Sequence, residues 1–126
     1  MAWTRTTENG RVVATETLTF TQDQATDLAS SAITWIPKGA DFTVIATVSA
    51  CLSAAADIAV WACDSESGTY ALLLDNFIAT GTWDVGATKV AAIYDNSLKG
   101  DSPYFKLYVD PSGAQDGDSV YLTVIS

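Results

Sequence analysis

The clearest structural signal in this chain is the hexapeptide Tyr-Phe-Lys-Leu-Tyr-Val at residues 104–109, in which apolar residues occupy every second position. Phe105, Leu107 and Val109 share one side of an extended chain, because successive side chains of a strand point to opposite faces. These three residues are predicted to face a core. The outward positions are then Tyr104, Lys106 and Tyr108.

The same alternation returns near the C-terminus, at residues 119–125. Its inward residues are Val120, Leu122 and Val124, and its outward residues are Tyr121, Thr123 and Ile125. If the two strands pair as a hairpin across residues 110–118, their outward tyrosines and isoleucine form one patch on the solvent side. Tyrosine is common at protein interfaces, because its ring buries apolar area while its hydroxyl stays polar. We therefore predict an oligomer or partner interface on this patch.

Period-two alternation recurs between turn residues along most of the chain, and it predicts an all-β protein. The expected strands cover residues 11–20, 42–50, 57–63, 69–74, 76–80, 88–94, 103–109 and 119–125, with a short extended piece at 33–36. About eight short antiparallel strands are typical of a β-sandwich, which is jelly-roll-like or, alternatively, immunoglobulin-like. The strand number favours the jelly roll. One short helix is expected at residues 22–30, because Thr21 and Gln24 have the spacing of a capping box.

The 126 residues fit one domain, and their 48% hydrophobic content is enough to fill a core. Residues 1–20 are expected to form an N-terminal arm and the first strand, because residues 1–10 hold almost no apolar residue except Trp3. The single sandwich domain then covers residues 21–126. No signal peptide or membrane helix is recognisable, so we expect a soluble domain that is made in the cytoplasm. Cys51 and Cys63 are expected to be reduced.

Acidic residues outnumber basic ones by 15 to 6, which gives a net charge of −9. The few cations are scattered singly along the chain, as Arg5, Arg11, Lys38, Lys89, Lys99 and Lys106. A nucleic-acid site needs clustered Lys and Arg, because its affinity comes from contacts with many phosphates. Anionic membranes likewise attract polybasic segments. The sequence therefore argues against nucleic acid and membrane surfaces as partners.

The chain contains no histidine, which excludes the commonest general base and every Ser-His or Cys-His nucleophile. Two cysteines without histidine cannot make a four-ligand zinc site. A pair of carboxylates could still support glycoside hydrolysis. The acidic loop 110–118 could wrap calcium, although it lacks the acid spacing of the twelve-residue calcium loop. Solvated loops account for most of these acids, so no catalytic residue, metal or cofactor is predicted.

The tryptophans extend the predicted contact surface. Segment 57–63 is apolar on both faces of its strand, so it lies centrally in a sheet or at an interface. Trp35 and Trp61 are expected in the core or an interface, whereas Trp3 and Trp83 have Thr-rich, exposed-looking surroundings. The full set of predicted interface residues is Trp3, Trp61, Tyr104, Tyr108, Tyr121 and Ile125.

The chain resembles, in style, the decoration or cement proteins of tailed phages, which sit on the outside of a capsid, often as trimers. The resemblance is carried by residues 56–61 (Ala-Asp-Ile-Ala-Val-Trp), 67–70 (Ser-Gly-Thr-Tyr) and 102–109 (Ser-Pro-Tyr-Phe-Lys-Leu-Tyr-Val). It implies a non-enzymatic virion protein, assembled in the host cytoplasm, that binds the major capsid protein as a homotrimer and stabilises the capsid. No functional residue is transferred from this class.

Two other functions fit the same residues. A carbohydrate-binding module, or a tail or fibre domain that recognises a glycan, would need aromatic side chains on a concave face. Trp83, Tyr94 and Tyr104 are the candidates for such a face. A small hydrolase would need two carboxylates that face one cleft, with a raised pKa. The arrangement of these side chains in space distinguishes the three functions.

Overall fold

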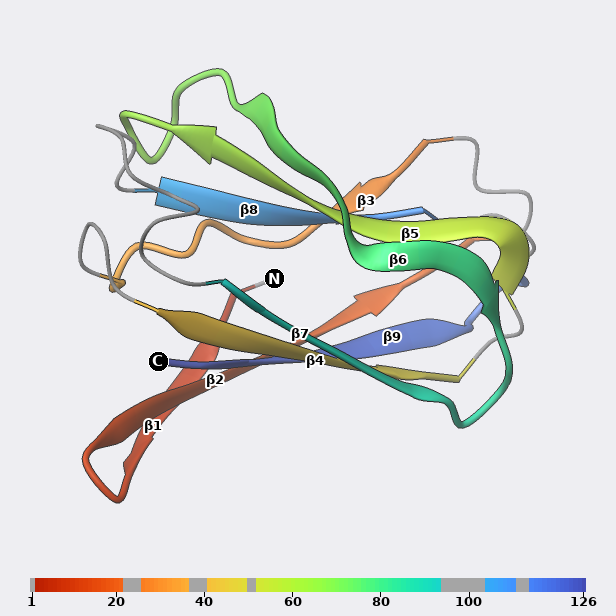
Figure 1. Ribbon diagram of the computed structural model, residues 1–126, viewed down its shortest axis with the longest axis horizontal. Helices are drawn as coiled ribbons and strands as arrows, with labels where there is room; N and C mark the ends of the chain where they lie inside the picture. Colours follow the sequence, from red (N-terminus) through yellow and green to blue (C-terminus); the bar gives the residue numbers. More distant parts are fainter. Residues whose placement is uncertain (1, 22–25, 37–40, 50–51, 94–103, 111–113) are drawn as a thin grey trace.

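The computed structural model describes residues 2–21, 26–36, 41–49, 52–93, 104–110 and 114–126. Two antiparallel sheets pack face to face as a β-sandwich, which confirms the predicted fold class (Figure 1). The described strands are β1 (Thr4–Glu8), β2 (Arg11–Thr19), β3 (Leu28–Ala29), β4 (Phe42–Val48), β5 (Leu52–Cys63), β6 (Ala71–Trp83), β7 (Thr88–Ile93), β8 (Tyr104–Val109) and β9 (Ser119–Ile125). Sheet A has the order β1-β2-β9-β4-β7, and sheet B has the order β3-β8-β5-β6.

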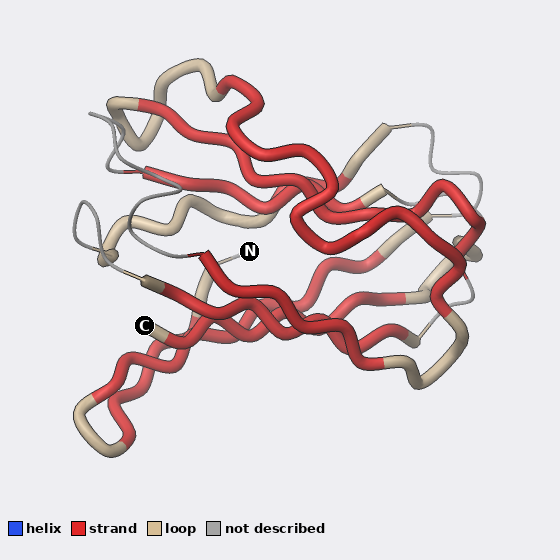
Figure 2. The backbone as a smooth tube through the Cα atoms, viewed as in Figure 1, coloured by secondary structure: helices blue, strands red, loops and turns tan. Residues whose placement is uncertain are grey.

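The connectivity is that of a jelly roll. Strands β2, β3, β4 and β5 pair with β9, β8, β7 and β6 respectively, like one long hairpin that bends between β5 and β6 and wraps around the core. The pairs β4·β9 and β5·β8 join the wrapped hairpin into two sheets. Strand β1 adds to β2 at the edge of sheet A. The described part of the chain consists of strands, turns and loops (Figure 2), and no helix in it could span a membrane.

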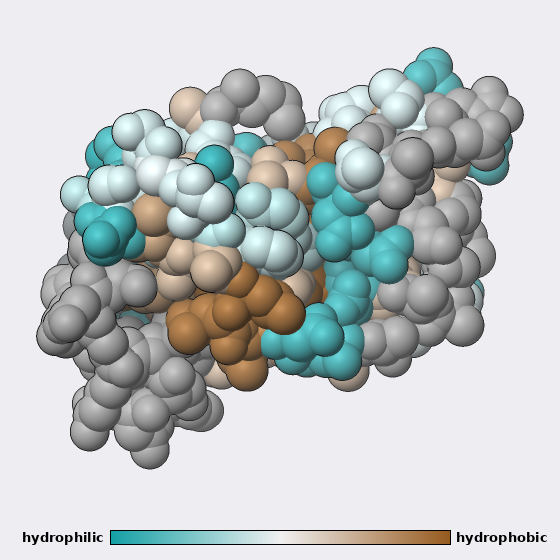
Figure 3. All heavy atoms as spheres, turned by 90° about the horizontal axis from the view of Figure 1, so that it is seen from above, coloured by the Kyte–Doolittle hydropathy of each residue, from teal (hydrophilic) through white to brown (hydrophobic). Residues whose placement is uncertain are grey.

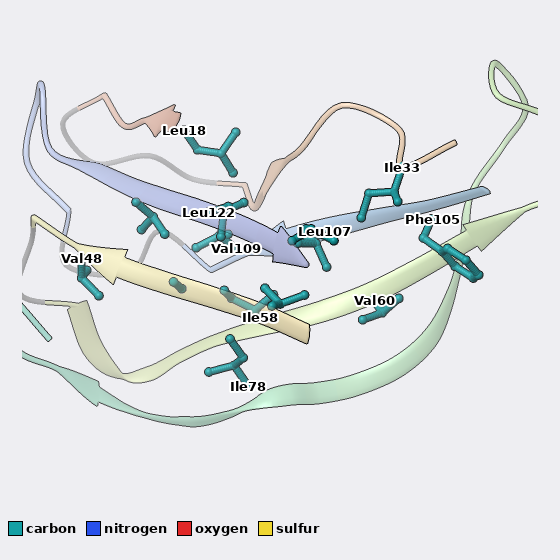
Figure 4. Close-up of a cluster of buried hydrophobic side chains, with 14 of the residues drawn as sticks. Leu18, Ile33, Val48, Ile58, Val60, Ile78, Phe105, Leu107, Val109 and Leu122 are labelled. Carbon is teal, nitrogen blue, oxygen red and sulfur yellow. The ribbon is translucent and has the colours of Figure 1, made fainter. Parts of the chain in front are cut away.

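The core lies between the two sheets and is built from the alternating inward residues. Ile58 and Leu107 of sheet B and Leu122 of sheet A are fully buried. Figure 4 shows such side chains reaching toward one another from both layers. Every inward position predicted for residues 104–109 and 119–125 is buried, as a period of two requires.

One carboxylate enters this core. Glu16 on β2 is 5% exposed, and its oxygens accept hydrogen bonds from the backbone N–H and the hydroxyl of Ser31 at 3.0 to 3.3 Å. A buried charge costs free energy unless it is hydrogen-bonded. These bonds therefore attach residues 30–33, which run along β8, to sheet A.

The predicted N-terminal arm contains β1, which a tight turn at Asn9-Gly10 joins to β2. Both turn residues have positive φ angles, 52° and 76°, which is typical of a two-residue hairpin. Trp3 fixes the start of this hairpin, because its Nε1 donates to the Ser31 carbonyl at 2.8 Å and its ring meets Trp35 edge-on at 5.9 Å. The described part of the arm therefore packs on its own chain.

Three predictions about the elements are wrong. Strands β8 and β9 lie in different sheets, because most successive strands of this jelly roll pass from one sheet to the other. The helix expected at 22–30 is contradicted over its described part, where Leu28–Ala29 pairs with β8 as strand β3. Residues 22–25 lie outside the described residues. The two strands expected at 69–74 and 76–80 are one strand, β6, which continues through Asn76 at a φ of 50°.

Candidate functional site

The outer face of sheet B carries an aromatic pair. Pairing between β5 and β8 sets Trp61 opposite Lys106 and Ala59 opposite Tyr108, while the alternate residue Val60 is buried in the core. Trp61 and Tyr108 therefore point away from the core on neighbouring strands. Their ring centres lie 4.6 Å apart and their planes differ by 30°, which is close to parallel stacking. Both residues are partly exposed, so the pair offers an apolar aromatic surface to solvent.

Tyrosines and one lysine extend this surface along the strands. Tyr104 occupies the next outward position of β8 after Lys106. The Lys106 Nζ lies 4.6 Å from the ring centre of Tyr70, a cation–π distance. The Tyr70 hydroxyl donates to the Glu66 carbonyl at 2.9 Å, and burial raises the pKa of that hydroxyl above its ordinary value. Tyr70 therefore stays neutral near neutral pH, and its ring, held by this hydrogen bond, binds the Lys106 ammonium group.

Four aspartates cross the same face in a row, with one at or beside each strand of sheet B. In the spatial order β3, β8, β5, β6 they are Asp27, Asp110, Asp57 and Asp75. Asp27, Asp57 and Asp110 each precede or follow a residue on the core side of its strand, and so they point outward. Asp75 joins them through a side-chain hydrogen bond with Asp57. The Asp110 N–H also donates to the Asp57 carbonyl at 3.0 Å. We call these four residues the acid row.

The acid row sets the electrostatics of the face. Partial burial, followed by the charges of Asp75, Asp110 and Asp27, raises the pKa of Asp57 to about 6, and a side-chain hydrogen bond with Asp75 adds to the shift. Burial and the charges of Asp110 and Asp75 also raise the pKa of Asp27. Like charges that influence one another in this way make further negative charge unfavourable. The face therefore disfavours anions and favours ligands that donate hydrogen bonds or carry positive charge.

An apolar ridge borders this face on β6, the edge strand of sheet B. Leu72, Leu73 and Leu74 are 50%, 44% and 36% exposed, and we call them the leucine ridge. Leu72 pairs with Trp61, so the ridge continues the aromatic surface toward the edge. Figure 3, which looks onto this side of the molecule, shows a compact hydrophobic patch beside a hydrophilic band. Periodicity did not single out the ridge, because a continuous apolar run also fits a strand buried on both faces.

The structure divides the six predicted interface residues among three places. Three of them share the outer face of sheet B, namely Trp61, Tyr104 and Tyr108. Tyr121, which is 45% exposed, and Ile125 lie on the outer face of sheet A. The single tyrosine patch expected from a β8–β9 hairpin is therefore wrong. Trp3 contacts the Ser31 carbonyl and Trp35 of its own chain.

The three aromatic residues first considered for a glycan site do not form one. Trp83 is 1% exposed, so its expected exposure is wrong. Register shifts along the β5·β6 pairing change which face later residues of β6 occupy, and the Trp83 indole packs into the core. Tyr94 lies outside the described residues. Of the two that are described, only Tyr104 lies on the outer face of sheet B.

The loop considered for calcium is described at its two ends. In it the Gln115 N–H donates to the Asp118 carboxylate at 3.0 Å, which closes a turn. Residues 111–113 lie outside the described residues, as does Cys51. Within the described ranges, no group of three or more acids or cysteines is placed to hold a metal ion. Cys63 is a buried free thiol.

No protein family matches the chain, and no curated protein matches it. Two solved structures with a similar arrangement are a bacterial adhesin domain and a carbohydrate-binding module. The first is a cleaved adhesin domain of Lys-gingipain from Porphyromonas gingivalis, with 15% identity and a TM-score of 0.48 over 91% of this chain and 73% of that one. The second, a variant of a family 29 carbohydrate-binding module, has 10% identity and a TM-score of 0.44 over 98% of this chain and 70% of that one. Both TM-scores lie below 0.5, so what this chain binds has to be argued from its own residues.

Proposed function

We propose that this protein is a non-catalytic binding domain that holds an uncharged or amino-sugar glycan on the outer face of sheet B. The observation that carries the proposal is the partly exposed ring pair of Trp61 and Tyr108, which stands on a rigid pair of central strands. A sugar ring has a face of C–H groups that stacks on an aromatic ring. It also has a rim of hydroxyl groups that donate hydrogen bonds. The aromatic pair can stack on the C–H face of the sugar, and the carboxylates of the acid row can accept hydrogen bonds from its hydroxyl groups.

The charges of the face restrict the class of glycan. A carboxylate accepts hydrogen bonds from hydroxyl or ammonium groups and donates none while it is ionised. The charges of the acid row contribute to the raised pKa of Asp57 and of Asp27, so a uronic acid or a sulfated sugar would meet like charge there. The ammonium group of Lys106 lies over the Tyr70 ring, and its single positive charge does not offset the negative charge of the acid row. Neutral and amino sugars are the glycans that this face accommodates.

Isothermal titration calorimetry with a panel of soluble neutral and amino-sugar oligosaccharides tests this function. Tyr108→Ala removes one ring of the pair and should weaken binding about tenfold or more, which corresponds to about 1.4 kcal/mol. Tyr121→Ala removes an exposed tyrosine from sheet A and is the matched control, with unchanged affinity per site expected. Absence of binding to the whole panel, or an equal loss in both variants, would contradict the proposal.

A second function, attachment to the outer surface of a phage capsid, is favoured by the leucine ridge. Edge strands of free-standing domains usually carry charge or proline, because an exposed apolar edge invites association. In this proposal the ridge packs against the major capsid protein, and the protein stabilises the virion as a homo-oligomer. Co-sedimentation with purified heads of tailed phages tests it. Leu73→Asp should abolish co-sedimentation. The control, Ser67→Asp in an exposed turn, should leave it unchanged. Equal behaviour of the two variants would show that the ridge is not the contact.

A further inference from the structure

The outer face of sheet A differs in kind from the outer face of sheet B. The register of the sheet aligns Thr4, Thr15, Thr123, Ile45 and Val90 in one row across all five strands. Thr15, Thr123 and Ile45 alternate with buried positions of their strands, so the row faces away from the sandwich. Thr4 and Val90 extend the row by pairing with Thr15 and Ile45. Val90 is 62% exposed. The central row is therefore made of threonine and branched apolar side chains.

The next row along the strands has the same character. It consists of Thr17, Tyr121, Thr47 and Thr88, and Tyr121 is 45% exposed. No charged residue occupies an outward position at residues 13–19 of β2, 43–47 of β4, 88–92 of β7 or 119–125 of β9. Charged residues begin beyond these ranges, for example at Arg11 and Asp41. We call the outward residues of these four ranges the threonine face.

Strand propensity alone does not account for this face. Threonine, valine and isoleucine favour exposed strands because β-branched side chains suit extended backbone. A solvent-facing sheet of a soluble domain nevertheless usually carries Lys, Glu or Asp among them, which prevents association. The chain has 15 acidic residues, and the outward positions of the four ranges named above hold none of them. Glu8 of β1, which pairs with Arg11, lies beyond them at the tip of the β1–β2 hairpin. The absence of charge from so broad a surface indicates a contact.

We propose that the threonine face packs against the same face of a second copy of this chain and forms a two-fold symmetric dimer. Each copy carries a net charge of −9, so two copies repel wherever their acids meet. Contact through sheet B would bring two acid rows together. Contact through the threonine face brings together no carboxylate from the named ranges, and an isologous pairing needs only one self-complementary patch.

The area of the threonine face is compatible with a second copy of the chain as its partner. Strands lie about 4.8 Å apart and rise about 3.4 Å per residue, so the four strands of the threonine face together with β1, at about six residues each, cover roughly 24 Å by 20 Å. Because side chains protrude from the sheet, the accessible area is larger than this flat footprint. It rises toward the roughly 800 Å² that each partner buries in a standard interface. Threonine hydroxyls can both donate and accept hydrogen bonds across such a contact, directly or through water.

This inference goes beyond the proposed glycan function and does not depend on it. Sheets A and B form the two layers of the sandwich (Figure 1), and the threonine face belongs to the first while the aromatic pair belongs to the second. Pairing through sheet A therefore leaves both sheet B faces directed outward. A dimer of this kind presents two ligand faces at once, which raises avidity for a repeating ligand without any new contact.

Light scattering behind a sizing column measures the prediction directly. The wild-type chain should elute at twice its mass of 13.3 kDa at micromolar concentration. Thr123→Arg puts a cation at the centre of the face and should return the mass to that of one chain. Val90→Arg, on the edge strand, should do the same, with circular dichroism showing an intact fold. Higher salt should strengthen the wild-type dimer, because it screens the repulsion between two acidic copies.

The control is Ser67→Arg, an equal change of charge in the exposed turn between β5 and β6, which both belong to sheet B. It should keep the dimer, because added positive charge outside the contact can only reduce repulsion. A wild-type monomer, a mass of three chains, or a dimer that survives both Thr123→Arg and Val90→Arg would overturn the inference. None of these outcomes bears on glycan binding, which is measured per site on the opposite face.

Discussion

At residue scale, Asp57 makes the stability of the domain depend on pH. Its pKa is raised from 3.8 to about 6, first by burial and then by the other members of the acid row. The native state therefore holds this proton more tightly than the unfolded state. The stabilisation is fully present below about pH 4 and is lost as pH rises through about 6. A shift of this size in a partly solvated group is screened, so we expect an effect of about 1 kcal/mol.

Asp57→Asn tests this account by urea unfolding at pH 4 and pH 8. The variant should match the wild type at pH 4 and be more stable at pH 8 by about 1 kcal/mol, because it removes one charge from the row. Glu8→Gln removes an equal charge at the exposed hairpin tip and is the control. A gain from Asp57→Asn that is the same at both pH values would refute the assignment.

The same residues mark the limit of what sequence can predict. Period two correctly gave the inward residues of β8 and β9, because strand geometry is local. It could not reveal the acid row, whose members Asp27, Asp57, Asp75 and Asp110 are far apart in sequence and meet only through the strand order of sheet B. The ring contact between Trp61 and Tyr108 has the same origin, since it joins two strands that are distant in the chain.

At the scale of elements, turns and register shifts explain most of the differences from the sequence prediction. The Asn9-Gly10 turn was a visible hairpin signal that could have placed β1, because both positions favour positive φ. The irregular pairing of β5 with β6 had no such signal. Its shifts turn Trp83 inward, and they are set by packing between the strands rather than by local residue preference. The expected exposure of Trp83 therefore failed because packing between strands, which local residue preference does not reveal, sets the register of β6.

The β1–β2 hairpin gives a prediction at this scale. Gly10 has a φ of 76° with open space around its missing side chain, so Gly10→Ala should cost about 1 kcal/mol through backbone strain alone. The loss is local, and amide hydrogen exchange of β1 should accelerate about fivefold while β4 is unchanged. Gly81→Ala is the control, since its φ is ordinary and no atom lies within 4 Å of the added methyl group. Equal exchange of β1 in both variants would show that the turn geometry does not hold the hairpin.

At the scale of the whole molecule, the jelly-roll winding explains why one small chain can present two unlike surfaces. Successive strands mostly pass from one sheet to the other, so both sheets share one core while each outer face draws its residues from all parts of the chain. The fold class could be predicted because strand number and alternation were sufficient for it. The assignment of β8 and β9 to opposite sheets could not, because alternation carries no information on which strands become neighbours.

This shared core predicts that the two sheets unfold together. Leu107 of sheet B and Leu122 of sheet A are both completely buried, so Leu107→Ala and Leu122→Ala should each lower the free energy of unfolding by about 2 to 5 kcal/mol. Because each sheet buries its inner face only against the other, either variant should show a single transition in urea, coincident by tryptophan fluorescence and circular dichroism. Two separated transitions in either variant would mean that one sheet keeps its structure without the other. The dimer contact on sheet A and the ligand face on sheet B would then belong to independently stable layers.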